Sequence, residues 1–267
     1  PVSQRELSWA RFGRSRVLLA SHRHDEAVES LQQLIAVHPD YMEAYDLLAE
    51  GLERQNKPGL AQKILERATD YSPNALLRQK HLAELAESNQ DMDTAAKAWQ
   101  RTVDLGTHSI HDSPQHYLAL SHTLCDLCEG DTGVEGAELA NDAFSVLGKM
   151  EKRFTDDDGL TLRSQIVQCR IYAGQQKVQK AEAILESIRP ELKNASSPDV
   201  ETGLDYAKTL FRLGYGEEAK ALLGELAERF RENPPTLRKI ESLLDEPVGF
   251  RMKVKARRLN RDGIKAF

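Results

Sequence analysis

The stretch YDLLAEGLERQNKPGLAQKILERATDYSP, residues 45–73, carries the pattern of two amphipathic helices joined by a turn. In each half, apolar side chains recur at steps of three and four residues, which places them on one face of a helix. These side chains are Tyr45, Leu48, Ala49 and Leu52 in the first half and Ala61, Ile64, Leu65 and Ala68 in the second. Residues 56–59 (NKPG) interrupt the pattern, and Pro73 follows the second half. The stretch therefore predicts a repeat of helix, turn, helix and turn.

This pattern recurs at a constant spacing in the N-terminal part of the chain. The same number of residues separates Ala27 from Ala61 and Ala61 from Ala95, and we call this spacing the repeat step. Four columns follow it: Ala27, Ala61 and Ala95; Ser15, Ala49 and Ala83; Leu31, Leu65 and Trp99; and Pro39 and Pro73. We expect the small residues where two helices cross, because a larger side chain would push the backbones apart. No helix can bury its apolar stripe alone, so the repeats are expected to stack.

Farther along the chain the spacing becomes less regular. Ala137, Ala181 and Ala219 take the same place at steps that are longer and unequal, and we assign the extra residues to longer loops or helices. The sequence therefore predicts an all-α fold, a right-handed superhelical solenoid of antiparallel helix pairs with about six repeats and a truncated seventh. The expected regions are three regular repeats in 1–105, three degenerate repeats in 106–235, and a short helix plus the first helix of the truncated repeat in 236–267.

The residues of 45–73 resemble the pattern of the tetratricopeptide repeat (TPR) family. The matching residues are Tyr45, Leu48, Ala49, Leu52, Ala61, Leu65, Ala68 and Pro73. The resemblance implies stacked helix pairs in which the first helix of each repeat lines the concave side. It also implies a protein–protein interaction scaffold or adaptor.

Three segments carry a more specific resemblance. Residues 38–50, 101–124 and 259–267 are similar to the repeat region of bacterial proteins in which a response-regulator receiver domain precedes TPRs. This resemblance implies the output portion of a two-component-type regulator in signal transduction, with a receiver domain N-terminal to the repeats. The chain begins with Pro1 rather than Met, which we interpret as a piece of a longer protein. The alternatives are a free-standing TPR adaptor without a receiver and a helical-repeat protein that binds nucleic acid.

Composition and charge restrict the choice of partner. With 40% hydrophobic and 29% charged residues, the chain suits a soluble folded protein, and its apolar runs fall short of the roughly 20 residues that span a bilayer. No secretory leader is visible, and three cysteines do not form a disulfide framework, so we expect a cytoplasmic protein. Residues 251–267 hold seven Lys and Arg against one Asp, a net charge of +6, so residues 1–250 carry −12. Such a body would repel nucleic acid.

The predicted concave side holds many carboxylates. Its residues are Glu43, Asp46, Glu50 and Glu53 in the second repeat, Lys80, Glu84 and Glu87 in the third, Gln115, Leu118, His122 and Cys125 in the fourth, and Arg163, Ile166 and Arg170 in the fifth. Six carboxylates in one groove repel one another unless a cation neutralises them. We therefore expect a protein or peptide partner with Lys or Arg to bind the second and third repeats; the alternative is a solvated charged face.

The first repeat differs, because its concave side is an apolar strip of Trp9, Phe12 and Leu19, with Arg16 among them. A terminal repeat normally has a polar cap. The strip is therefore expected either to pack under a preceding segment or to dock a partner or a second copy of the chain.

Histidine and cysteine gather in residues 107–128, which hold four of the eight histidines and two of the three cysteines. His122, Cys125 and Cys128 are spaced three apart on one predicted helix, so the third leaves the face that the first two share. A structural zinc site needs four converging ligands, commonly as two short pairs, and no second CxxC pair exists. We expect no metal or cofactor here, and the role of the segment from His108 to Cys128 stays open. We find no nucleophile beside a base, so we do not expect an enzyme.

Overall fold

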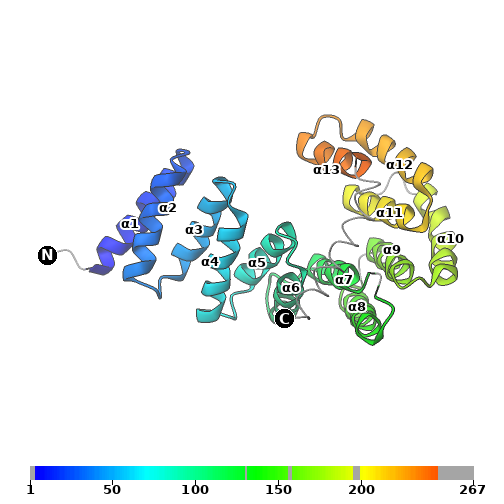
Figure 1. Cartoon of the computed structure of the whole chain (residues 1–267), viewed down its shortest axis with the longest axis horizontal. Helices are drawn as coiled ribbons and strands as arrows, with labels where there is room; N and C mark the ends of the chain where they lie inside the picture. The colour runs from blue at the N-terminus through cyan, green and yellow to red at the C-terminus, as the bar shows by residue number, and fades with distance from the viewer. Residues whose placement is uncertain (1–3, 130, 156–157, 195–198, 246–267) are drawn as a thin grey trace, which may run out of the picture. The chain divides into compact units, whose positions relative to one another are not determined.

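The computed structural model describes residues 4–129, 131–155, 158–194 and 199–245, and these ranges form α-helices joined by turns and loops, without a strand (Figure 1). The chain divides into two compact units, residues 1–123 and 124–267, called unit one and unit two below. The helices are α1 (Gln4–Ala20), α2 (His24–Val37), α3 (Met42–Arg54), α4 (Pro58–Tyr71), α5 (Leu76–Ser88), α6 (Met92–Gly106), α7 (Pro114–Cys128), α8 (Val134–Arg153), α9 (Asp158–Gly174), α10 (Val178–Asn194), α11 (Val200–Leu213), α12 (Gly216–Arg229) and α13 (Pro234–Asp245). The predicted all-α repeat fold of paired helices is confirmed.

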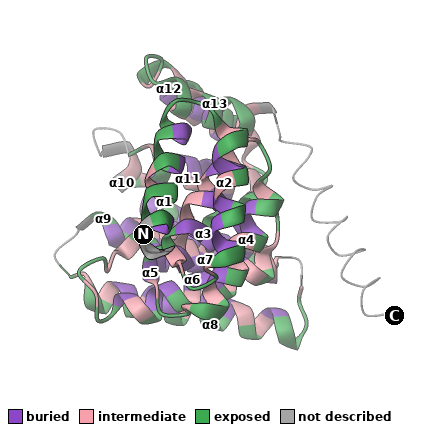
Figure 2. Cartoon of the chain, turned by 90° about the vertical axis from the view of Figure 1, so that its left-hand side faces the viewer, coloured by how far each residue is buried: buried purple, intermediate pink, exposed green. Residues whose placement is uncertain are grey.

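Unit one stacks its helices in chain order. Within it, α1 packs on α2, α3 on α4 and α5 on α6, while α2 also contacts α3 and α4 contacts α5. The alanines that follow the repeat step lie inside this stack and have no solvent exposure: Ala27, Ala49, Ala61, Ala83 and Ala95. The helices of unit one carry buried residues where they pack against their neighbours, drawn in purple in Figure 2. The close approach of neighbouring helices explains why the sequence places a methyl group at these positions.

The turns inside five of the helix pairs, α1–α2, α3–α4, α5–α6, α9–α10 and α11–α12, share one geometry. In the second repeat, the N–H of Lys57 donates to the carbonyl of Leu52 at 2.9 Å and the N–H of Asn56 donates to that of Glu53 at 2.8 Å. These two bonds close a Schellman motif, in which the residue after the helix adopts a left-handed conformation. The residues with positive φ are His22, Asn56, Gln90, Gln176 and Gly214, and the first three are separated by one repeat step each.

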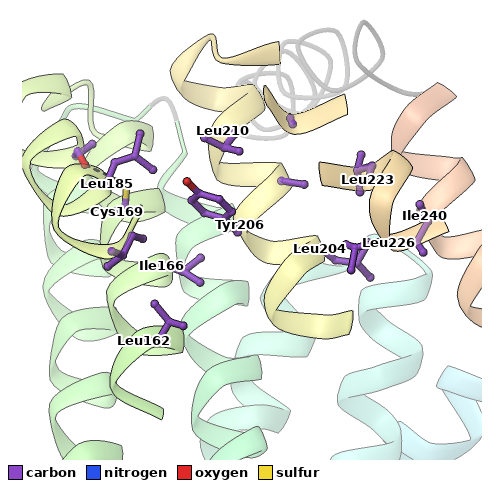
Figure 3. Close-up of a cluster of buried hydrophobic side chains, with 14 residues drawn as sticks. Leu162, Ile166, Cys169, Leu185, Leu204, Tyr206, Leu210, Leu223, Leu226 and Ile240 are labelled. Atoms are coloured by element: carbon purple, nitrogen blue, oxygen red, sulfur yellow. Dashed lines mark hydrogen bonds between the residues drawn. The ribbon is translucent and has the colours of Figure 1, made fainter. Parts of the chain in front are cut away.

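Unit two buries a continuous apolar core between its helices. Here α9 packs on α10 and on α11, α11 packs on α12, and α13 contacts both α11 and α12. The core draws residues from all five of these helices (Figure 3). Leu204 and Leu226 both belong to this core (Figure 3). Gly203 lets α11 approach α12 closely, because a Cβ there would lie 2.7 Å from Cδ1 of Leu226.

The repeat at α7 and α8 departs from the predicted packing. Ala181 and Ala219 are fully buried as expected, but Ala137 is only half-buried, so its predicted place at a helix crossing is wrong. A close approach in this repeat involves Gly136 and the loop before α8, because a Cβ on Gly136 would lie 2.0 Å from the carbonyl oxygen of Asp131.

The side chain of Gln175 stabilises the connection between α7 and α8 through hydrogen bonds. The amide of Gln175 donates to the carbonyl oxygens of Cys128, Asp131 and Gly136, at 3.2, 3.0 and 3.3 Å. The buried side chain of Gln175 thereby ties the end of α7, the loop and the start of α8 together.

The short helix expected near 236–245 is present as α13. The truncated seventh repeat, which the sequence predicts in 255–267, lies outside the described residues. The division between regular and degenerate repeats at residue 105 stays a prediction. Among the described helices, none combines the length and the apolar character that crossing a membrane requires.

Candidate partner-binding surface

The first helices of the pairs in unit one, α1, α3 and α5, carry the residues that the sequence assigned to the concave side. We call the surface formed by Trp9, Phe12, Arg16, Glu43, Asp46, Glu50, Leu77, Lys80 and Glu84 the inner face of unit one. Glu43 and Glu84 are exposed, and Asp46, Glu50 and Lys80 are partly exposed. The surface is therefore accessible to a partner and rich in carboxylates.

Two side-chain contacts link α3 to α5. The guanidinium of Arg78 binds both carboxylate oxygens of Asp46, with its Nε at 2.7 Å and its Nη2 at 2.8 Å. Such a two-point contact is the strongest common geometry for an arginine–carboxylate pair. Nε2 of His81 lies 2.9 Å from the carboxylate of Glu53. Asp46 and Glu53 therefore fix the neighbouring helix, and their oxygens are already occupied.

Other carboxylates also have partners within unit one. Glu50 pairs with Arg54, whose second Nη donates to the carbonyl of Leu19 at 3.1 Å. Nζ of Lys80 lies 3.5 Å from Glu84.

Glu87 is held more firmly, because it accepts hydrogen bonds from Nε1 of Trp99 at 2.8 Å and from the hydroxyl of Thr123 at 2.7 Å. Most of the six carboxylates therefore have contacts inside the chain, supplied among others by Arg54, Arg78 and His81, and their binding of a cationic partner stays a prediction. Glu43 is the exception: within the described part of the chain it makes no ion pair and no side-chain hydrogen bond.

The three apolar residues of the strip predicted on α1 differ in how far they are buried. Trp9 is 73% exposed, whereas Phe12 is half-buried with its ring 5.4 Å from the ring of Tyr41. Leu19 is 2% exposed and belongs to a buried cluster with Leu18. Leu19 is therefore a packing residue of the predicted packing or docking strip, because the helix turns it toward α2 and α3.

One exposed apolar residue was missed by the sequence reasoning. Leu77 on α5 is 60% exposed and lies one repeat step after Glu43, which itself lies one repeat step after Trp9. The period that revealed the repeat would have placed Leu77 on the inner face, but the predicted track in the third repeat began at Lys80.

Most of the residues predicted on the corresponding side of unit two are buried, although Arg163 is partly exposed. Ile166 and Arg170, which the sequence placed on the concave side of the fifth repeat, are only 1% and 4% exposed, and Cys125 of the fourth repeat is buried too. Within unit one, Leu118 of the fourth repeat is likewise buried. The predicted groove therefore does not continue through these residues.

A buried ion network takes the place of the groove in unit two. Arg170 pairs with Asp126, and Arg212 contacts Asp126 at 3.3 Å and Glu129 at 2.8 Å through its Nε. Burial disfavours the charged guanidinium of Arg170, but the neighbouring carboxylate of Asp126 outweighs it and holds the pKa of Arg170 above its usual value. This network joins α7, α9 and α11.

The cysteines of the chain are structural. Cys125, Cys128 and Cys169 are free thiols and buried. The Cys128 thiol donates to the carbonyl of Cys125. A side-chain hydrogen bond with Cys125, together with burial, raises the pKa of Cys128 far above its usual range. Burial raises the pKa of Cys169 to about 12. The thiols of Cys128 and Cys169 therefore stay protonated and unreactive at neutral pH.

The histidines of the segment 107–128 do not converge. His108 and His111 are exposed, while His116 is buried and stacks on Trp99 with ring centroids 6.2 Å apart. Burial, with Lys80 nearby, lowers the pKa of His116. Among the described residues, no three His, Cys, Asp or Glu side chains are grouped so that they could hold a metal ion.

No family model matches the sequence, and no curated protein matches it either. Several solved structures share its fold. A TPR protein from Parabacteroides merdae is similar with a TM-score of 0.58 at 12% identity, over 90% of this chain and 91% of that one. A thermophilic TPR protein from Thermus thermophilus gives 0.50 at 19% identity, over 76% and 98% of the two chains. An assembly chaperone of RpL4 (Acl4) gives 0.53 at 13% identity, over 95% and 99%. The chain therefore has the fold of tetratricopeptide repeat proteins.

Proposed function

We propose that this chain is a protein-binding scaffold without catalytic activity, and that the inner face of unit one binds a basic segment of a partner protein. The observation that carries the proposal is the set of accessible carboxylates Glu43, Glu50 and Glu84 on adjacent first helices. Stacked helix pairs present extended surfaces of this kind. The ion network of unit two has no such opening, so the proposal assigns binding to unit one.

The overall charge supports a basic partner. Residues 1–250 carry a net charge of −12, which attracts cationic proteins over a distance and repels anionic ones. The exposed ion pairs on the inner face are weak, because water screens them, so a partner's Lys or Arg can compete for Glu50 or Glu84. Binding should therefore weaken as the salt concentration rises.

The test compares two double charge reversals in the whole chain. Glu50→Lys with Glu84→Lys should abolish capture of those lysate proteins that the wild type retains at low salt and releases at high salt. The matched control, Glu225→Lys with Glu228→Lys, changes the net charge equally on exposed positions of α12 and should leave capture unchanged. Equal capture by wild type and both variants would contradict the proposal.

The proposal has a second part, which the sequence supports through residues 38–50, 101–124 and 259–267. In it, the scaffold is the output portion of a bacterial response regulator in the cytoplasm, and phosphorylation of an N-terminal receiver domain changes what the inner face can bind. The sequence of the full-length gene product tests it. A receiver domain with a phosphate-accepting Asp upstream of Pro1 is the expected result, and its absence would favour the free-standing adaptor.

A further inference from the structure

Three residues at the same position of successive repeats form a row across the inner face of unit one. They are Trp9 on α1, Glu43 on α3 and Leu77 on α5, each one repeat step from the next. All three side chains are exposed, Trp9 to 73% and Leu77 to 60%. The row therefore presents an apolar, an acidic and an apolar group to solvent.

The three helices that carry the row are linked by side chains, although α2 and α4 lie between them in the sequence. Arg54 of α3 reaches the last turn of α1 at the carbonyl of Leu19, and Arg78 of α5 pairs with Asp46 of α3. Packed helices have axes about 10 Å apart, so successive members of the row are separated by about that distance.

Glu43 differs from the other carboxylates of the inner face. Asp46 is held by Arg78 and Glu50 by Arg54, whereas Glu43 makes no ion pair within the described residues. A parallel row one turn along the helices, Phe12, Asp46 and Lys80, lacks these properties, because Phe12 packs on Tyr41 and Asp46 is occupied. The row of Trp9, Glu43 and Leu77 is therefore the one that offers an open anion between two exposed apolar side chains.

We propose that this row recognises an extended partner segment in which a Lys or Arg has an apolar residue three positions before it and another three positions after it. The spacing follows from geometry: an extended chain advances about 3.3–3.6 Å per residue, so about three residues span one helix-to-helix step. The apolar residues cover Trp9 and Leu77, and the cation meets Glu43. The inference rests on the proposed function and specifies the partner's sequence.

The experiment selects binders for the whole chain from a phage-displayed library of random dodecapeptides. Wild-type protein should enrich peptides with the apolar–basic–apolar spacing of three. Glu43→Arg should enrich peptides with Asp or Glu at the central position, because the charge at the centre of the row is inverted. The control Glu29→Arg, on an exposed site of α2, should enrich the same peptides as the wild type.

Tryptophan fluorescence measures binding of the selected peptides without a label. The chain has two tryptophans, and Trp99 is buried whereas Trp9 is exposed, so a shift of the emission to shorter wavelength reports that Trp9 is covered. Exposed aromatic anchors commonly dominate such interfaces, so Trp9→Ala should weaken binding by about thirtyfold. Leu77→Ser should weaken it by about fivefold, and Glu43→Arg by about tenfold.

The outcomes separate this inference from the proposed function. Enriched peptides that lack the spacing, or that bind without shifting the emission of Trp9, would overturn the inference. If such peptides do not bind the Glu50→Lys, Glu84→Lys variant, the proposed function stands although the inference fails. The inference alone is also overturned if the library yields no binding peptide while the Glu50→Lys, Glu84→Lys variant still fails to capture the lysate proteins.

Discussion

The two units of this chain use the same paired-helix plan with opposite results on the side of the first helices. In unit one, that side carries half-exposed ion pairs and an open carboxylate, Glu43. In unit two, it is filled by Arg170 and Arg212, whose charges are satisfied by Asp126 and Glu129. A helical repeat therefore does not by itself create a groove, because the side chains of the first helices decide whether the surface opens to a partner or becomes part of the interior.

The largest predicted effect is on the free energy of unfolding, and it compares the Arg170–Asp126 contact of unit two with the Arg78–Asp46 contact of unit one. Asp126→Ala leaves Arg170 as a buried charge without its main partner, which should lower the free energy of unfolding of unit two by about 3–5 kcal/mol. Asp46→Ala should cost less in unit one, about 1–2 kcal/mol, because Asp46 is 43% exposed and water can reach the site.

Urea unfolding of the whole chain distinguishes the two losses. Both tryptophans, Trp9 and Trp99, belong to unit one, so their emission follows that unit, while far-ultraviolet circular dichroism follows both. Equal losses for the two variants would show that the buried and the exposed contact do not differ in energy.

A smaller effect tests the packing that is special to the repeat at α7 and α8. Gly136→Ala would place a Cβ 2.0 Å from the carbonyl oxygen of Asp131, so we expect a loss of about 1–3 kcal/mol. Gly148→Ala on the same helix meets no atom within 4 Å and should stabilise the helix by up to about 1 kcal/mol. Thermal melting measures both, and a destabilising Gly148→Ala would contradict this account of α8.

The turns offer a comparison across the two units at a still smaller scale. Gln90 in unit one has φ of 63°, a conformation that glycine adopts without strain, so Gln90→Gly should raise stability by about 1 kcal/mol. Gly214 in unit two has φ of 89°, and Gly214→Ala should lower stability by a similar amount. Opposite shifts of the urea midpoint are expected; shifts of the same sign would argue against a shared turn geometry.

The smallest expected effect is a pH dependence confined to unit one. Because burial lowers the pKa of His116, the folded state binds its proton less tightly than the unfolded chain, where the pKa is about 6.5. The contribution of neutral His116 is therefore fully present above about pH 6.5 and is lost as the pH falls below it. His116→Phe keeps an aromatic ring against Trp99 and should reduce this dependence of the urea midpoint, measured by tryptophan emission.

His108→Gln is the matched control, because His108 is exposed in the loop before α7. It should leave the pH profile of unit one unchanged. If His108→Gln flattened the pH profile and His116→Phe did not, the assignment of the titration to His116 would be wrong.

Some predictions succeeded because they depend on local periodicity. Helix pairs and the buried alanines at 27, 61 and 95 follow from a step that repeats in the sequence, and Ala181 and Ala219 follow the same logic. The prediction for Ala137 failed because the loop before α8 folds back onto the start of that helix at Gly136, a contact that helical periodicity does not describe. For Leu19 the sequence left packing and docking open, and the neighbours α2 and α3 decide that it packs.

The sequence by itself determined the helices, their pairing and the residues that fill the contacts between them, because helical periodicity is local and the repeat step carries it from one helix pair to the next. Only the tertiary structure decided which charges are open. Asp46 meets Arg78 from the next repeat, and Arg212 meets Glu129 from a helix 83 residues earlier. Such pairs depend on how neighbouring helices cross, which the order of residues along one helix does not specify.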